Sequence, residues 1–107
     1  MMRAPFLVPV LLRFPGSAAR QDSWGRLLKI TAEGAELSTA APLAKGEELL
    51  LMFELGGEQL RMSARVHYSD NDADGQCVAD LRWNGMVERR RLARVLLDVL
   101  SRASAGA

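Results

Sequence analysis

The sequence predicts a mainly β fold: a six-stranded antiparallel barrel followed by one C-terminal α-helix. Six short segments, either apolar throughout or alternating between apolar and polar residues, are separated by turns rich in Gly, Pro, Asp and Asn. This pattern is typical of small barrels and rolled sheets. After about Val87 the apolar residues recur every three or four positions, which indicates a helix. A chain of 107 residues suits one domain, so we expect a single domain over residues 1–107.

The six expected strands lie between those turns. We place them at residues 7–14, 26–30, 35–38, 49–55, 61–68 and 77–83. The small and polar segment 15–25 is an expected loop. Pro9 places the first strand at a sheet edge or a bulge, because proline cannot donate to a strand ladder. Alternation is clearest in the fifth strand. Its expected inward side chains are Met62, Ala64, Val66 and Tyr68, and its outward side chains are Arg61, Ser63, Arg65 and His67.

The expected helix, at about residues 87–103, is amphipathic. Its apolar face consists of Leu92, Val95, Leu96, Val99, Leu100 and Ala103. Arg90, Arg91 and Arg94 lie on the other side and are the candidate partner-binding residues. A basic face of this kind can bind an acidic protein, nucleic acid or a membrane surface, or it can be the solvated side of a helix that caps the barrel. The helix could also form a homo-oligomer if its apolar face is broader than the barrel end covers.

The composition argues against several classes of site. The chain has one cysteine, Cys77, and one histidine, His67. An internal disulfide is therefore excluded, and a zinc site or a catalytic triad lacks partners. The segment DNDADG at residues 70–75 matches the opening of a calcium loop, but the acidic residue that should end the loop is Leu81. We expect a protein that is not an enzyme and binds no metal.

The charge and the N-terminal run bear on localisation. A net charge of +1 demands neither nucleic acid nor an anionic membrane. The apolar run 4–12 follows a basic start, as in a secretory signal, but Pro5 and Pro9 interrupt it and Arg13 follows at once. No segment approaches the ~20 apolar residues of a transmembrane helix. Together with the single cysteine, these features predict a cytoplasmic protein with no nucleic acid bound and no membrane insertion.

Several motifs resemble the PilZ domain family in their order and spacing over nearly the whole chain. The run LAKG at residues 43–46, followed by Leu49, Leu51 and Phe53, is similar to the family's LxxGxxLxLxF run. The segment VHY at residues 66–68 is similar to its xVxW/Y strand, and VADL at 78–81 more loosely to its GVxF strand. The resemblance implies a six-stranded barrel with one C-terminal helix, a bacterial signalling role and cyclic di-GMP as the ligand.

The resemblance places the ligand site on KITAEG, where the family has [D/N]xSxxG. Gly34 keeps the motif glycine, expected in a turn with positive φ, and Thr31 replaces Ser and keeps a hydroxyl. Lys29 replaces the Asp or Asn that accepts a hydrogen bond from guanine, and an ammonium group cannot accept one. Arg3 matches the second arginine of the family's RxxxR pair, and the first would precede Met1. We therefore expect an incomplete clamp for the ligand's phosphates.

These features predict a non-enzymatic PilZ-like regulatory module. We expect it to act through contacts with an unidentified protein partner, with lost or weak cyclic di-GMP binding, and to serve motility or surface behaviour. Two alternatives stay open. One is a genuine cyclic di-GMP receptor of modest affinity, whose melting temperature would rise with ligand concentration. The other is a small nucleic-acid-binding barrel that uses the basic helix, whose binding would fall steeply with salt.

Overall fold

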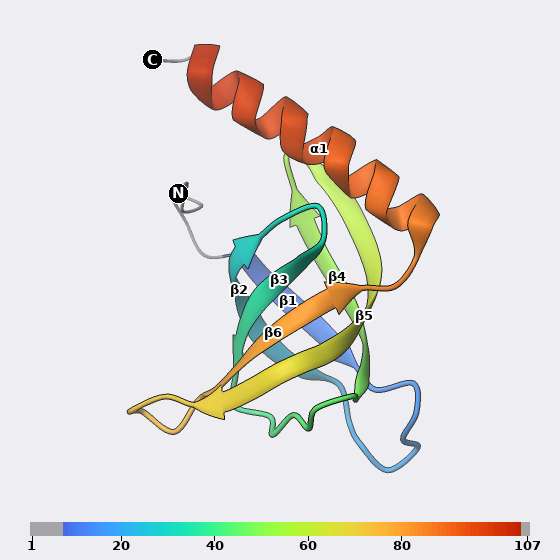
Figure 1. Cartoon of the computed structure of the whole chain (residues 1–107), viewed down its shortest axis with the longest axis vertical. Coiled ribbons are helices and arrows are strands. Elements are labelled where there is room, and N and C mark those ends of the chain that lie inside the picture. The colour runs from blue at the N-terminus through green and yellow to red at the C-terminus, as the bar shows by residue number, and fades with distance from the viewer. Residues whose placement is uncertain (1–7, 106–107) are drawn as a thin grey trace.

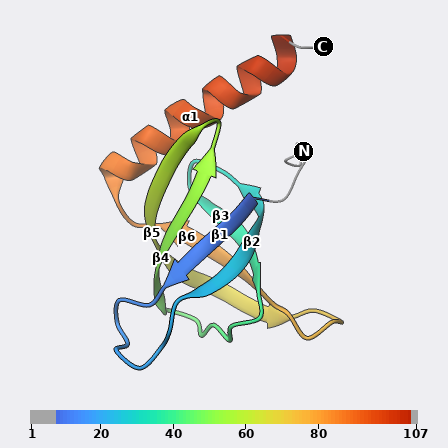
Figure 2. The same ribbon diagram turned by 180° about the vertical axis from the view of Figure 1, so that it is seen from behind.

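The computed structural model describes residues 8–105, and the side chains of residues 8–102. The elements in chain order are β1 (Val8–Arg13), β2 (Ser23–Ile30), β3 (Gly34–Thr39), β4 (Glu48–Leu55), β5 (Glu58–Asn71), β6 (Cys77–Trp83) and α1 (Met86–Ala105). The strands close into a barrel in the order β1-β2-β3-β6-β5-β4, with antiparallel neighbours. Figures 1 and 2 show α1 lying across one end of this barrel. The predicted fold class, six antiparallel strands and a C-terminal helix, is confirmed.

The barrel interior is filled mainly by aliphatic side chains, as the scarcity of aromatic residues requires. Alternate residues of each strand point inward, and Leu12, Leu37, Leu51 and Leu81 are fully buried. Burying one such side chain stabilises the fold by about 1.5–3 kcal/mol. The single buried polar side chain among the described residues is Thr39, whose hydroxyl donates to the Trp24 carbonyl oxygen at 3.0 Å. The core therefore carries little polar cost.

The second strand begins earlier than predicted. It starts at Ser23, within the segment expected to be a loop. Gly25 explains the difference, because an ideal Cβ at this position would lie 2.9 Å from the carbonyl oxygen of Ser38 on β3. In the sequence Gly25 suggests a loop, whereas in the structure it permits the close packing of β2 against β3.

Tyr68 was wrongly expected to face the core. A register shift between Val66 and Tyr68 interrupts the β5–β6 ladder, as in a β-bulge, where one extra residue shifts the alternation that follows it. Met62, Ala64 and Val66 are buried as predicted, whereas Tyr68 is 59% exposed. The strand also continues to Asn71, beyond the end expected from the polar residues after Tyr68.

Pro9 does not mark an edge strand, because β1 pairs with β2 on one side and with β4 on the other. The proline lies opposite Arg26 of β2 and one residue before Val10, the first β1 residue of the β4 ladder. A proline at the start of a ladder removes no donor that the ladder needs. The barrel can therefore close around it.

Helix α1 packs over the β4–β5 turn. Leu92 and Val95 are buried in the core, and Leu96 and Val99 pack against it. The contact at the turn is close, since an ideal Cβ on Gly56 would lie 2.8 Å from Cγ2 of Val99. These four residues confirm most of the expected apolar face.

The C-terminal end of α1 extends beyond the barrel (Figure 1). Leu100, expected on the packed face, is accordingly exposed, and its neighbour Leu97 is 67% exposed. The side chain of Ala103 lies outside the described residues. No helix among the described residues combines the length and apolarity needed to cross a membrane.

Candidate functional site

The turn between β2 and β3 is built around Thr31. Its hydroxyl oxygen accepts hydrogen bonds from the backbone N–H groups of Gly34 at 3.1 Å and Glu33 at 3.3 Å. The Thr31 backbone N–H donates to the Gly34 carbonyl oxygen at 2.8 Å. Serine and threonine hydroxyls commonly close turns in this way. Replacing the motif serine by threonine therefore preserves the local structure of the turn.

Trp83, at the end of β6, anchors this turn to the barrel. Its indole N–H donates to the Thr31 carbonyl oxygen at 2.9 Å, and its backbone N–H donates to the Glu33 carbonyl oxygen at 3.0 Å. The indole ring is buried and stacks on Phe53 of β4, with 6.3 Å between the ring centroids. The turn is thus tied to residues from two distant strands.

Gly34 is required for a reason other than the predicted one. The described glycines with positive φ are Gly46, Gly56, Gly57 and Gly75, so the expectation of positive φ at Gly34 was wrong. Gly34 is buried where β3 approaches β6. An ideal Cβ there would overlap the carbonyl oxygen of Leu81 and lie 2.9 Å from its carbonyl carbon. The motif glycine permits this close backbone approach.

A shallow hollow of about 240 Å³ lies beside the turn. The turn itself is at the end of the barrel that α1 crosses (Figures 1 and 2). We call it the turn hollow. Its lining residues are Lys29, Thr31, Glu33, Gly34, Ala35, Glu36, Asp80, Leu81 and Arg82. The structure thus brings together Lys29, Thr31 and Gly34, three of the four residues predicted for the ligand site. The fourth, Arg3, lies outside the described residues.

The charges of the turn hollow come from neighbouring strands. Lys29 of β2 lies opposite Glu36 of β3, which in turn lies opposite Asp80 of β6. Arg82 pairs with Asp80 at 3.5 Å. With Glu33, the hollow has three acidic and two basic side chains. Glu36, Asp80 and Arg82 are not predicted from the motif. The pairing of β2 with β3 brings Glu36 beside Lys29, and the pairing of β3 with β6 brings Asp80 and Arg82.

Two further arginines near the motif in sequence, Arg20 and Arg26, do not line the turn hollow. Arg20 is engaged at the other end of β3, where it forms an ion pair with Glu47 and donates to the Pro42 carbonyl oxygen at 2.6 Å. Its guanidinium carbon also lies 3.8 Å from the centroid of the Phe14 ring. Arg26 is exposed and is not among the residues that line the turn hollow.

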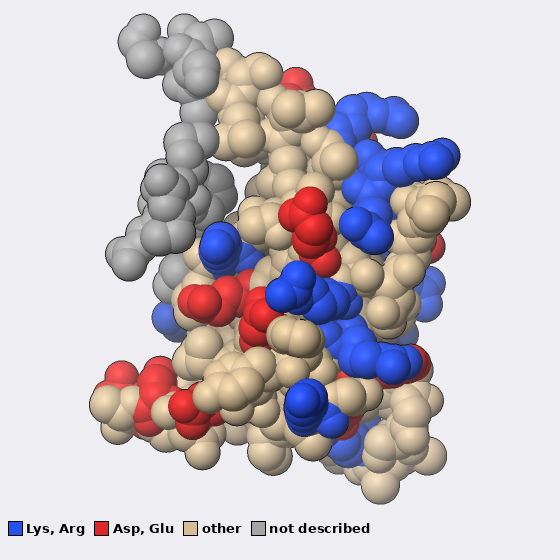
Figure 3. Space-filling view, in the orientation of Figure 1, with Lys and Arg blue, Asp and Glu red and all other residues tan. Residues whose placement is uncertain are grey.

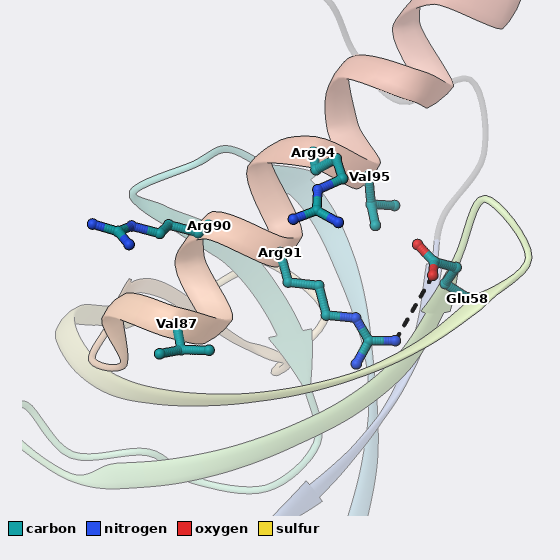
Figure 4. A pocket seen from close by; sticks show the side chains of 6 residues that line it. All are labelled: Glu58, Val87, Arg90, Arg91, Arg94 and Val95. Carbon is teal, nitrogen blue, oxygen red and sulfur yellow. Dashed lines mark ion pairs between the residues drawn. The ribbon is translucent and has the colours of Figure 1, made fainter.

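A second hollow lies between α1 and the β4–β5 turn. We call it the arginine groove; it has a volume of about 410 Å³ and is lined by Glu58, Val87, Arg90, Arg91, Arg94 and Val95. In Figure 4, Arg91 reaches toward Glu58, Arg94 and Val95 lie on the same side of the helix, and Arg90 extends away from Glu58. The structure thus brings the three predicted partner-binding arginines to one groove.

The acidic segment after β5 forms the hairpin turn that connects β5 to β6. The Asp72 carboxylate accepts hydrogen bonds from the backbone N–H groups of Asp74 at 2.8 Å and Gln76 at 3.0 Å. Asparagine and aspartate close turns in this way without any ion. Over the described residues, His, Cys, Asp and Glu side chains form no cluster of three or more that could hold a metal.

A closed six-stranded barrel with a strand-junction turn built on threonine and glycine, and a helix across the same end, defines a small β-barrel class of domain. The family model for the PilZ domain matches residues 2–98, and the chain belongs to the PilZ domain family. PilZ domains are cyclic di-GMP-binding regulators and are generally non-catalytic. The predicted family is therefore confirmed.

Solved structures share the fold. The Bacillus subtilis inhibitor of motility (MotI/DgrA) superposes with a TM-score of 0.70 at 18% identity, covering 96% of this chain and 50% of that one. MrkH of K. pneumonia in its apo state gives 0.68 at 16% identity, covering 99% and 52%. The PilZ domain of CeSA from a cellulose-synthesizing bacterium gives 0.61 at 19% identity, covering 94% and 97%. The chain thus spans about half the length of the first and second of these structures. No curated protein matches the sequence.

Proposed function

We propose that this chain is a non-enzymatic regulatory PilZ domain that acts through contacts with a protein partner and binds cyclic di-GMP weakly or not at all. The observation that carries the proposal is the position of Lys29, which lines the turn hollow where the family motif has Asp or Asn. The turn itself is intact, with Thr31 and Gly34 in place. The proposal is thus that the fold has been kept and the ligand chemistry has changed.

The lysine changes the hydrogen bonding available to a guanine base. Its ammonium group has three donors and no acceptor. The N–H groups on the edge of guanine that the family residue contacts would lose their acceptor. Leaving a donor unpaired in a binding site costs about 1–3 kcal/mol, which corresponds to about a 5- to 150-fold loss of affinity.

The acidic side chains of the turn hollow add a second cost. Cyclic di-GMP is an anion, and Glu33, Glu36 and Asp80 line the hollow with carboxylates. The cations of the lining are Lys29 and Arg82, which pairs with Asp80 at 3.5 Å, so the hollow keeps one more acidic than basic side chain. The electrostatic balance of the hollow therefore disfavours a phosphate ligand.

The family and the neighbours support a regulatory role. PilZ domains are regulators, and the B. subtilis structure is described as an inhibitor of motility. These descriptions support the proposal that the chain serves bacterial control of motility or surface behaviour, in the cytoplasm. A cyclic di-GMP receptor of modest affinity is the alternative, and the intact Thr31 turn favours it. A nucleic-acid-binding barrel is disfavoured by the net charge of +1.

The effect of Lys29 can be tested by restoring the motif. We expect Lys29→Asn, combined with an arginine pair added ahead of Arg3, to produce a melting temperature that rises with cyclic di-GMP concentration. Asparagine supplies the missing acceptor, and the arginines supply the phosphate clamp. Differential scanning calorimetry over a ligand series measures the shift.

The control has the added arginines but keeps Lys29. It should bind about 5- to 150-fold more weakly than the combined variant. Equal affinity of the two proteins would mean that Lys29 does not obstruct the ligand, and the chemical basis of the proposal would be lost.

A further inference from the structure

We propose that the arginine groove is a docking site for an acidic, amphipathic segment of a protein partner. The inference rests on the protein-contact mode proposed above and gives it a place and a chemistry. The groove lies between the first half of α1 and the β4–β5 turn, and none of its residues lines the turn hollow. A partner can therefore dock in the arginine groove without contacting the turn hollow.

The groove has an excess of positive charge. Three arginines, Arg90, Arg91 and Arg94, and one carboxylate, that of Glu58, line the groove. The Arg91–Glu58 pair is long, at 3.8 Å, and both side chains are more than half exposed, so it contributes little and exchanges readily. Among the described side chains, no carboxylate lies within ion-pair distance of Arg90 or Arg94. Figure 3 shows the resulting cluster of basic side chains over this half of α1.

The basic side chains of the groove follow closely along the helix. Arg89, Arg90 and Arg91 are consecutive within the first two turns of α1, and Arg94 lies about one turn further on. Glu88 is the acidic residue of the first turn. The groove arginines lie beyond the first turn, where the partial positive charge of the helix end has fallen off. An acidic partner would therefore interact with the guanidinium groups themselves.

The groove also offers apolar contact. Val87, on its rim, is 76% exposed, and Met86 beside it is exposed as well. Val95 lines the groove from the next turns and is buried against the barrel. An apolar side chain of the partner can cover Val87 while neighbouring carboxylates reach Arg91 and Arg94. The planar, forked guanidinium group matches a carboxylate with two hydrogen bonds.

These features favour an acidic protein segment over nucleic acid. Glu58 stands in the groove and would repel a continuous phosphate backbone, whereas a protein segment can place its carboxylates on either side of it. Nucleic-acid sites generally extend as a basic stripe along a domain of strongly basic composition. This chain has 14 basic and 13 acidic residues.

The probe for the test is a short fluorescein-labelled peptide of glutamate and leucine in helical spacing. We expect it to bind the full chain in fluorescence anisotropy, with an affinity that falls as salt increases. The double variant Arg91→Ala, Arg94→Ala should weaken binding about tenfold. Arg102→Ala is the matched control, because Arg102 lies on the same helix, pairs with Asp98 at 2.6 Å and is outside the groove. It should leave the affinity unchanged.

Glu58→Gln is a sharper test than the arginine variants, because it should increase the affinity for the peptide. It removes the competing carboxylate and frees Arg91, so peptide affinity should rise about two- to fivefold. A purely structural role for the Arg91–Glu58 pair gives no such gain. Melting temperatures measured in parallel establish that every variant is folded.

Several outcomes would overturn the docking proposal. They are no peptide binding, an equal loss in Arg102→Ala, or tighter binding of duplex DNA that depends on the same arginines. Failure here leaves the proposed function standing, since cyclic di-GMP titration of the turn hollow decides that separately. Conversely, tight cyclic di-GMP binding together with peptide binding at the groove would refute the proposed loss of nucleotide binding and would keep the docking site.

Discussion

Gly34→Ala is expected to lower the free energy of unfolding by about 3 kcal/mol or more, an effect at the upper end for overpacking. The new Cβ would overlap the Leu81 carbonyl oxygen, so β3 and β6 would have to separate where the barrel closes. Backbone atoms on both strands leave no flexible side chain that can move aside. Chemical denaturation followed by circular dichroism measures the loss, and a variant that fails to fold agrees with it.

Gly16→Ala is the matched control. An added Cβ at Gly16 meets no atom within 4 Å, and its φ is not positive. Its effect on stability should therefore stay within about 0.5 kcal/mol of zero. If Gly34→Ala were as mild as Gly16→Ala, the close approach of β3 and β6 would be wrong, and with it the structural reason for the motif glycine.

Trp83→Ala is expected to cost about 3–5 kcal/mol, the usual range for truncating a buried aromatic side chain. The indole is 5% exposed, stacks on Phe53 and donates to the Thr31 carbonyl oxygen. The substitution therefore leaves a cavity in the barrel and an unpaired carbonyl in the β2–β3 turn. Equilibrium unfolding in urea measures the change.

Trp24→Ala serves as the control, because Trp24 is 67% exposed on the outer side of β2. Its cost should be about 1 kcal/mol or less. The two tryptophans also separate spectroscopically. The variant that retains only Trp83 should emit at shorter wavelength than the one that retains only Trp24. Similar costs and similar emission for the two variants would show that Trp83 is not buried at the turn.

The strands with regular alternation were predictable from the sequence, and the irregular ones were not. In β5, apolar and polar residues alternate as far as Val66, so both the strand and its inward face follow from the pattern. The bulge before Tyr68 depends on pairing with β6 and has no local signal. The early start of β2 is similar, since Gly25 suggests a loop until the neighbouring strand is known to require a residue without a side chain.

The sequence predicts only those residues of the candidate site that are close to one another along the chain. The motif places Lys29, Thr31 and Gly34 in one turn, because they are close in sequence. Glu36 and Asp80 join them through the pairing of β2 with β3 and β3 with β6, which alternation alone does not give. The arginine groove is similar: helical spacing groups the arginines, whereas Glu58 reaches them through the packing of α1 on the β4–β5 turn.

The most direct test of the central claim, that the PilZ fold persists while its nucleotide chemistry has changed, is isothermal titration of the purified chain with cyclic di-GMP. The arrangement of Lys29 with Glu33, Glu36 and Asp80 in the turn hollow predicts no saturable heat at micromolar ligand. A saturable isotherm with micromolar or tighter affinity would contradict the claim, and it would mean that the chain is a cyclic di-GMP receptor whose site accommodates the lysine.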